Sequence, residues 1–306
     1  MPHISLNTAR FTALLRADLL LLIIAVIWGL AFAFQRLGAD FLGPFSFNAA
    51  RYSMAAGCLA LLLGLRRSRK ILAHGYPLAG GLLGLVLMAG TSLQQAGLAH
   101  TTAGKAGFIT GLYVVLVPLL GLFFGQRPGW LTAAGALVAM MGLYFLSVNQ
   151  QLQIGAGDLL VLASAFCWAA HVLLTGYYAR RFAPLPLAFW QFVTTATLSV
   201  AAALMFEAPQ PAHFLAAGTA LLYTGIVATA VAFTLQIKAQ QHSPPSHAAL
   251  IMSLETVFAA FGGWWLLSET LTGRDMFGAM LMFTGMLLSQ LALFRPQAKP
   301  VQATQT

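Results

Sequence analysis

The sequence predicts an all-α membrane protein with ten transmembrane helices, arranged as two inverted five-helix repeats. Composition, apolar run length and an internal repeat support this fold class. Of the 306 residues, 59% are apolar and 8% are charged, and this composition is far more apolar than that of a water-soluble domain. A helix needs about 20 consecutive, mostly apolar residues to cross a bilayer, and runs of this kind follow one another along the chain.

Ten apolar runs are separated by short polar or Gly/Pro segments, which is the pattern of a bundle of membrane helices. By residue number, the runs lie at 19–38, 45–65, 76–98, 104–124, 130–147, 158–179, 186–206, 214–236, 246–267 and 276–294. The segments between the runs leave no room for a separate soluble domain. We therefore expect the helical bundle itself to carry the function.

Similar residues recur at a nearly constant displacement, which divides the chain into two halves. Three matches are displaced by 140 positions: Asp18 with Asp158, Trp28 with Trp168, and Pro44 with Pro184. Two further matches are displaced by 142 positions: Gln94 with Gln236, and Tyr113 with Glu255. Because each half holds an odd number of spans, the second half enters the bilayer from the opposite side, as in transporters with inverted repeats. We expect the two repeats to be residues 1–150 and 151–306.

The net charge of +9 follows the expected topology. If the N-terminus is cytoplasmic, twelve of the sixteen Lys and Arg residues fall on the cytoplasmic side, as the positive-inside rule requires. We therefore expect a multi-pass protein of the inner membrane with both termini in the cytoplasm. The lipid bilayer is its expected partner, and the basic residues do not form the aromatic-interleaved surface that nucleic-acid binding needs.

One acidic residue, Glu255, falls in the middle of the ninth run, roughly 14 Å along the helix from its start. A carboxylate near the bilayer midplane is costly and usually faces a cavity, so Glu255 is a candidate site residue. Ala259 and Gly262 share its helical face and leave room for a ligand. Tyr113 takes the equivalent place in the first repeat. The alternative is a structural carboxyl group that joins two helices by hydrogen bonds.

Four further residues are candidates for the same central space. Trp28 and Trp168 lie about 15 Å deep, although tryptophan prefers the membrane interfaces, so they line a wet cavity, face lipid or pack in the core. His171 lies one turn after Trp168 and either packs in its neutral form or contacts the ligand or a proton. Lys105 either faces the central space or extends to the headgroups. For Arg51 we expect a structural role, with its side chain extended toward the outer interface.

The run TTAGKAGFITGLYVVLVPLLG, from Thr101 to Gly121, and the endings of the two halves resemble the EamA-type transporters of the drug/metabolite transporter superfamily. The resemblance covers nearly the whole chain and implies the ten-helix fold and the export of amino acids, metabolites or toxic compounds. Two departures stand out. The Leu-Gly-Glu ending of the family is Ser268-Glu269 in the second half but Gly125-Gln126 in the first, which loses a charge. Thr256 replaces the proline that usually follows the Leu-Glu motif, so we expect a kink to be lost there.

The sequence thus predicts a secondary transporter, more specifically an exporter of small organic metabolites such as amino acids, that works by alternating access. Aromatic rings would contact the substrate, and Glu255 would accept a substrate ammonium group or a coupling proton. The predicted substrate-binding residues are Trp28, Lys105, Tyr113, Trp168, His171 and Glu255. No catalytic motif, metal-ligand spacing or cofactor signature is found in the sequence. A multidrug or cationic-compound exporter is the main alternative, followed by a channel-like facilitator and an intramembrane enzyme.

Overall fold

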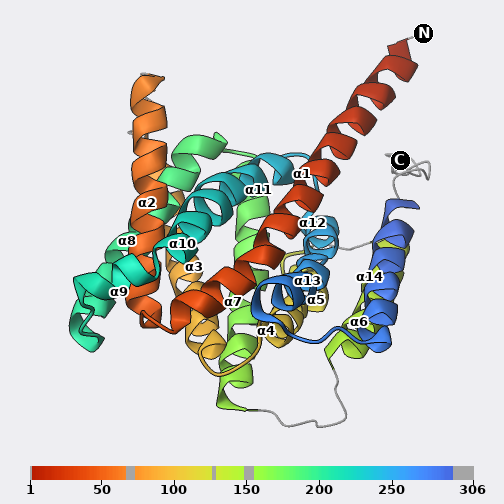
Figure 1. Ribbon diagram of the computed structural model, residues 1–306. Helices are drawn as coiled ribbons and strands as arrows, with labels where there is room; N and C mark the ends of the chain where they lie inside the picture. The colour runs from red at the N-terminus through yellow and green to blue at the C-terminus, as the bar shows by residue number, and fades with distance from the viewer. Residues whose placement is uncertain (1, 67–72, 126–128, 148–154, 292–306) are drawn as a thin grey trace.

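The computed structural model describes residues 2–66, 73–125, 129–147 and 155–291 (Figure 1). Within these ranges every regular element is a helix and no strand occurs, which confirms the all-α class. Seven of the described helical segments are long and apolar enough to span a membrane. They are Phe11–Ala39, Tyr76–Leu98, Ala103–Phe123, Ala156–Ala179, Pro184–Phe206, Gly218–Gln240 and Pro245–Leu267. The expected boundary between the repeats, at residues 150 and 151, lies outside the described residues.

Successive spans of the first half cross the molecule in alternating directions. Their helices are α1 (Pro2–Ala39), α2 (Pro44–Leu65), α3 (Tyr76–Leu98), α4 (Ala103–Gly111), α5 (Tyr113–Phe123) and α6 (Trp130–Ser147). We call the face of the bundle at which α1 begins the proximal face, and the face at which α1 ends the distal face. Pro44 begins α2 because a proline at the first helical position lacks only an N–H that would have no partner within the helix.

The helices of the second half follow the same order with more interruptions. They are α7 (Ala156–Ala179), α8 (Pro184–Phe206), α9 (Pro211–Ala216), α10 (Gly218–Leu222), η2 (Tyr223–Val231), α11 (Ala232–Gln240), α12 (Pro245–Met252), α13 (Glu255–Leu267) and α14 (Gly273–Leu291). The η2 segment is a π-helix, a rare form that is frequent at functional sites. Proline again begins α8 and α12.

Helices of the two halves pack against each other. The main contacts join α2 with α8, α1 with α13, α3 with both α7 and α8, and α6 with α14. The last pair lies at one edge of the bundle (Figure 1), where Gly135 faces the backbone of Gly285 and Gly142 faces the backbone of Gly278. Small residues of this kind let two membrane helices approach closely. The two halves are therefore interleaved.

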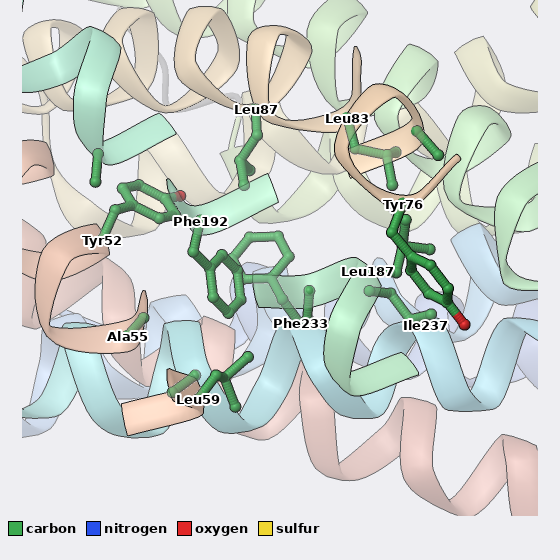
Figure 2. Close-up of a cluster of buried hydrophobic side chains, with 14 of the residues drawn as sticks. Tyr52, Ala55, Leu59, Tyr76, Leu83, Leu87, Leu187, Phe192, Phe233 and Ile237 are labelled. Atoms are coloured by element: carbon green, nitrogen blue, oxygen red, sulfur yellow. The ribbon is translucent and has the colours of Figure 1, made fainter. Parts of the chain in front are cut away.

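A core of aromatic and aliphatic side chains fills the space between α2, α3, α8 and α11. Figure 2 shows Tyr52, Phe192 and Phe233 turned toward one another, and the rings of Phe192 and Phe233 have centroids 6.2 Å apart. In contrast, many large apolar side chains lie on the outer surface, such as Leu65 at 74% exposure and Phe123 at 86%. An apolar exterior around a packed interior is expected of a bundle that has lipid as its solvent.

Two of the expected spans are interrupted at equivalent places. Helix α4 ends at Gly111 and α5 begins at Tyr113, while α12 ends at Met252 and α13 begins at Glu255. At both breaks the backbone tightens to three-residue hydrogen bonds, from the N–H of Leu112 to Ile109 O (3.2 Å) and from the N–H of Leu254 to Ile251 O (3.2 Å).

The loss of a kink at Thr256 stays a prediction, but the helix is interrupted just before this residue. The chain is interrupted at Ser253 and Leu254 without a proline. Thr256 Oγ1 donates a hydrogen bond to Gly107 O (3.0 Å), which ties the start of α13 to α4. As a result, Tyr113 and Glu255 are each the first residue of a half-helix.

Candidate functional site

A small cavity lies in the interior, where helices of both halves meet. Its volume is about 40 Å³, room for a few water molecules. The aromatic side chains that line it come from α1, α5, α7 and α11. The polar side chains come from α1, α2, α3, α4, η2, α11 and α13. The aromatic residues are Trp28, Phe32, Tyr113, Trp168 and Phe233. The polar residues are Gln35, Arg51, Gln94, Thr110, Thr229, Gln236 and Glu255.

The two repeat-related tryptophans line this cavity with their indole N–H groups already bonded. Trp28 Nε1 donates to Ala228 O in the π-helix η2 (2.8 Å), and Trp168 Nε1 donates to Gln94 Oε1 (2.7 Å). Phe233 lies between them, with ring centroids 4.7 Å from Trp28 and 6.1 Å from Trp168. The three rings form an apolar wall fixed by hydrogen bonds at its edges.

Glu255 and Tyr113 line the same cavity from the interrupted helices. Glu255 is 3% exposed and lies at the first turn of α13, where the positive end of the helix dipole favours an anion. The Tyr113 hydroxyl group lies close to the Glu255 carboxyl group but lacks the geometry of a hydrogen bond. Among the described residues, no cation lies within ion-pair distance of Glu255.

Arg51 is the basic residue among the cavity residues that the sequence reasoning missed. It is 4% exposed, so the expectation that its side chain extends to the outer interface is wrong. One terminal nitrogen donates to Gln35 Oε1 and the other to Tyr52 Oη, both at 3.1 Å, while Nε has no partner in the described structure. No described carboxylate forms an ion pair with it. Arg51 lies about 10 Å along α2, so the depth argument used for Glu255 would have found it.

Arg51 belongs to a hydrogen-bonded chain that ends at a cavity tryptophan. Gln35 Oε1 accepts from both Arg51 and Gln94 Nε2, the latter at 3.2 Å. Gln94 Oε1 in turn accepts from Trp168. Side chains from α1, α2, α3 and α7 therefore hold one another in position around the cavity.

Two of the residues predicted to bind substrate lie away from the cavity lining. His171 is buried behind Trp168, with ring centroids 6.1 Å apart, and its Nε2 lies 3.3 Å from Gln191 Oε1. Lys105 lies in the first turn of α4 at the distal face, where its Nζ is 2.6 Å from Asp158 Oδ2. Lys105 therefore lies outside the cavity lining in this structure, because Asp158 holds it at the helix end.

Comparisons with known proteins give one consistent result. The model of the EamA-like transporter family matches residues 15–148 and again residues 155–291. An Archaeoglobus fulgidus protein named an uncharacterized transporter is 35% identical over 287 residues, which cover 90% of this chain and 86% of that protein. The aromatic amino acid exporter YddG of Escherichia coli is 32% identical over 181 residues, 55% of this chain and 61% of that protein.

Two further similarities extend over more of the chain. The probable amino-acid metabolite efflux pump of Escherichia coli is 25% identical over 289 residues, which cover 90% of this chain and 94% of that protein. A solved crystal structure superposes with a TM-score of 0.72 at 20% identity, over 92% of this chain and 99% of that one. At this identity the superposition supports the fold alone.

Proposed function

The chain belongs to the EamA-like transporter family, and on this premise we propose that it is a secondary transporter that exports small zwitterionic metabolites of the amino-acid class by alternating access. In this proposal α2, α6 and α14 join the seven candidate spans to give ten membrane helices. They form two inverted repeats, residues 1–150 and 151–306. The proximal face, with both termini, lies in the cytoplasm, and the chain crosses the inner membrane.

The observation that carries this proposal is a buried basic group and a buried acidic group on one cavity. Arg51 and Glu255 are both buried, both line the cavity, and neither has an ion-pair partner among the described residues. A buried charge without a partner is strongly unfavourable. A zwitterion resolves both, with its carboxylate on Arg51 and its ammonium group on Glu255.

The aromatic wall supplies the remaining contacts. Trp28, Trp168 and Phe233 offer apolar area to a substrate side chain and ring faces to its ammonium group. His171 supports Trp168 from behind, and Lys105 acts at the distal face instead of contacting the substrate. Before substrate binds, Glu255 is also the cavity's candidate site for a coupling proton.

The size of the cavity supports movement of the two halves. A volume of about 40 Å³ holds a few waters but is smaller than an amino acid. Helices must separate on one side to admit a substrate, and a midplane site between inverted repeats is the arrangement from which alternating access follows. A cationic-compound exporter would also use Glu255 and the aromatic wall, but Arg51 would repel a substrate that carries only a positive charge.

Counterflow in proteoliposomes tests the proposal with three compounds that share one side chain. Phenylalanine carries both charges, phenethylamine carries only the ammonium group, and 3-phenylpropionate carries only the carboxylate. We expect phenylalanine to be exchanged and to compete at least tenfold better than either analogue, because each charged hydrogen bond contributes about 1.5–3 kcal/mol. If phenethylamine is exchanged faster, or competes better, than phenylalanine, the result would favour the cationic-compound exporter. Uptake of phenylalanine without any counterflow would indicate a channel-like facilitator.

Two variants assign the charges to their residues. Arg51→Gln should remove the advantage of phenylalanine over phenethylamine, and Glu255→Gln should remove its advantage over 3-phenylpropionate. Arg181→Gln is the matched control, because Arg181 is an exposed cation that contacts Tyr177 on the surface. If both cavity variants weaken all three compounds by the same factor, the charge assignment is wrong.

A further inference from the structure

Two contacts between an acidic and a basic side chain join the halves at positions that the repeat relates to each other. At the distal face, Lys105 of the first half lies 2.6 Å from Asp158 of the second. At the proximal face, His247 Nε2 of the second half lies 3.0 Å from Asp18 Oδ1 of the first. Asp158 follows Asp18 by 140 positions and His247 follows Lys105 by 142, the same displacements that relate the rest of the two halves. The two pairs are therefore the same contact, built once at each face.

The proximal pair is buried and accommodates either charge state of the imidazole. His247 Nδ1 lies 3.0 Å from Ser289 Oγ on α14, and Ser289 Oγ lies 3.5 Å from Thr132 Oγ1 on α6. In neutral His247 the Ser289 hydroxyl group donates to Nδ1. In protonated His247, Nδ1–H donates to Ser289, whose hydroxyl group turns to Thr132. Asp18 Oδ2 is buried without a hydrogen-bond partner in the described structure, so a full positive charge on His247 gives it a counter-charge.

The groups around His247 leave Asp18 as its ionisable partner. Helix α12 packs against α1, α5, α6, α7 and α14. From α6 and α14 the facing groups are the two hydroxyls of Thr132 and Ser289, and among described residues of α5 and α7 no ionisable group lies within ion-pair distance. The remaining charges nearby line a neighbouring proximal hollow of about 400 Å³. They are Arg16, Lys238 and His242.

The two pairs differ in how they respond to protons. Lysine keeps its charge through neutral pH, whereas histidine gains or loses its proton between about pH 5 and 8. Protonation turns the His247–Asp18 hydrogen bond into an ion pair, because the imidazolium adds Coulomb attraction to the hydrogen bond with the Asp18 carboxylate. The added strength is present at low pH and is lost as the pH rises.

We propose that the Asp18–His247 pair is a proton-binding site, separate from the substrate cavity, that holds the proximal face closed, and that Lys105–Asp158 is its proton-insensitive counterpart at the distal face. This inference rests on the proposed alternating access, because each pair has to separate before its own face opens. Acid on the proximal side then stabilises proximal closure and slows loading of the cavity from that side. The distal face opens and closes with no such dependence.

Distance measurements by electron paramagnetic resonance test this in lipid nanodiscs without substrate. Spin labels at Leu15 and Leu287 report the proximal face, and labels at Phe41 and Leu271 report the distal face; all four side chains are exposed. The chain's own cysteines are replaced beforehand. We expect the proximal-open population to fall severalfold between about pH 8 and pH 5.5, while the distal face stays mainly closed.

Exchanging the two cations supplies the decisive variants. His247→Lys should abolish the proximal pH response, and Lys105→His should create one at the distal face. His247→Gln serves if the lysine variant does not fold, and it should also abolish the response. His242→Gln is the matched control, because this exposed histidine lines the neighbouring hollow and its loss should leave the response intact.

The outcomes separate this inference from the proposed function. A wild-type proximal distance that is independent of pH, that lengthens in acid, or that keeps its pH response in His247→Lys overturns the inference. The distances are measured without substrate, so they report on the Asp18–His247 pair whatever the chain transports. Loss of phenylalanine counterflow with an intact pH response would overturn the substrate class alone.

Discussion

The distal and proximal faces are built from the same repeat but are held closed by different chemistry. At the distal face, Glu207 accepts from the backbone N–H of Phe45 and Ser46 (2.9 and 2.8 Å) and from the Ser46 hydroxyl group, at the start of α2. Glu269 accepts from the N–H groups of Ala103 and Gly104 (3.0 and 3.2 Å), at the start of α4. Each carboxylate of the second half caps a helix of the first.

The proximal face replaces part of this charge with neutral groups. The counterpart of the start of α2 is the start of α8, where Ala183 N–H donates to the Tyr76 hydroxyl group (3.0 Å). The counterpart of Lys105–Asp158 is the Asp18–His247 pair, whose positive charge depends on pH. The counterpart of Glu269 is Gln126, which lies outside the described residues. The distal face therefore has three described carboxylate contacts between the halves, and the proximal face has one.

This difference has an energetic consequence. A hydrogen bond to a charged group contributes about 1.5–3 kcal/mol, and a neutral one about 0.5–1.5 kcal/mol. An anion at a helix N-terminus gains further from the helix dipole. We therefore expect distal closure to be the more stable of the two, so that the empty protein opens mainly at its proximal face. An exporter that loads from the cytoplasm requires this order.

The largest effect should come from removing the cap on α2. Glu207→Ala leaves the N–H groups of Phe45 and Ser46 without their acceptor and should destabilise distal closure by about 2–4 kcal/mol. The distal spin-label pair should then show a distal-open population raised by a factor of thirty or more, taking 1.4 kcal/mol as roughly tenfold. Asp40→Ala is the control, since the exposed Asp40 forms a surface ion pair with Arg36, four residues earlier in the chain. An equal effect in the control would contradict the cap.

A smaller shift is expected at α4. Glu269→Gln keeps the size and one acceptor oxygen but loses the charge, which should cost distal closure about 1–2 kcal/mol and raise the distal-open population roughly tenfold. The same spin-label pair measures it. A rise in the proximal-open population instead would mean that Glu269 does not hold the distal face.

The smallest effect belongs to the neutral contact of the proximal face. Tyr76→Phe removes one hydrogen bond to Ala183 and should favour proximal opening by about 1 kcal/mol, roughly a fivefold change in population. The Leu15–Leu287 pair reports it. A Tyr76→Phe effect larger than that of Glu207→Ala would reverse the ranking of the two faces.

The sequence predicted the fold class because bilayer thickness and the repeat are long-range patterns that survive in a single chain. It placed Trp28, Trp168, Tyr113 and Glu255 by depth and by repeat position, and the structure puts all four on one cavity. Whether they bind substrate stays a prediction. Arg51 lies at a comparable depth and could have been added in the same way, but its long basic side chain was expected to reach the interface.

The features that the sequence could not supply depend on contacts between the halves. The helix breaks before Tyr113 and Glu255 contain no proline, so the sequence does not predict them. Lys105 was predicted to bind substrate and not to pair with Asp158, because Asp158 belongs to the other half and the residue equivalent to Lys105 is a histidine, His247. When the two repeats form the same contact with different residue types, a search for similar residues does not find that contact.

The most direct test measures both faces of the same protein in nanodiscs, with the proximal and distal label pairs read in parallel, with and without phenylalanine. We expect the empty protein to populate a proximal-open, distal-closed state. Phenylalanine should shift molecules toward proximal closure without opening both faces at once. Simultaneous lengthening of both distances would indicate a continuous pore. A distal-open, proximal-closed empty state would contradict the order of the two faces.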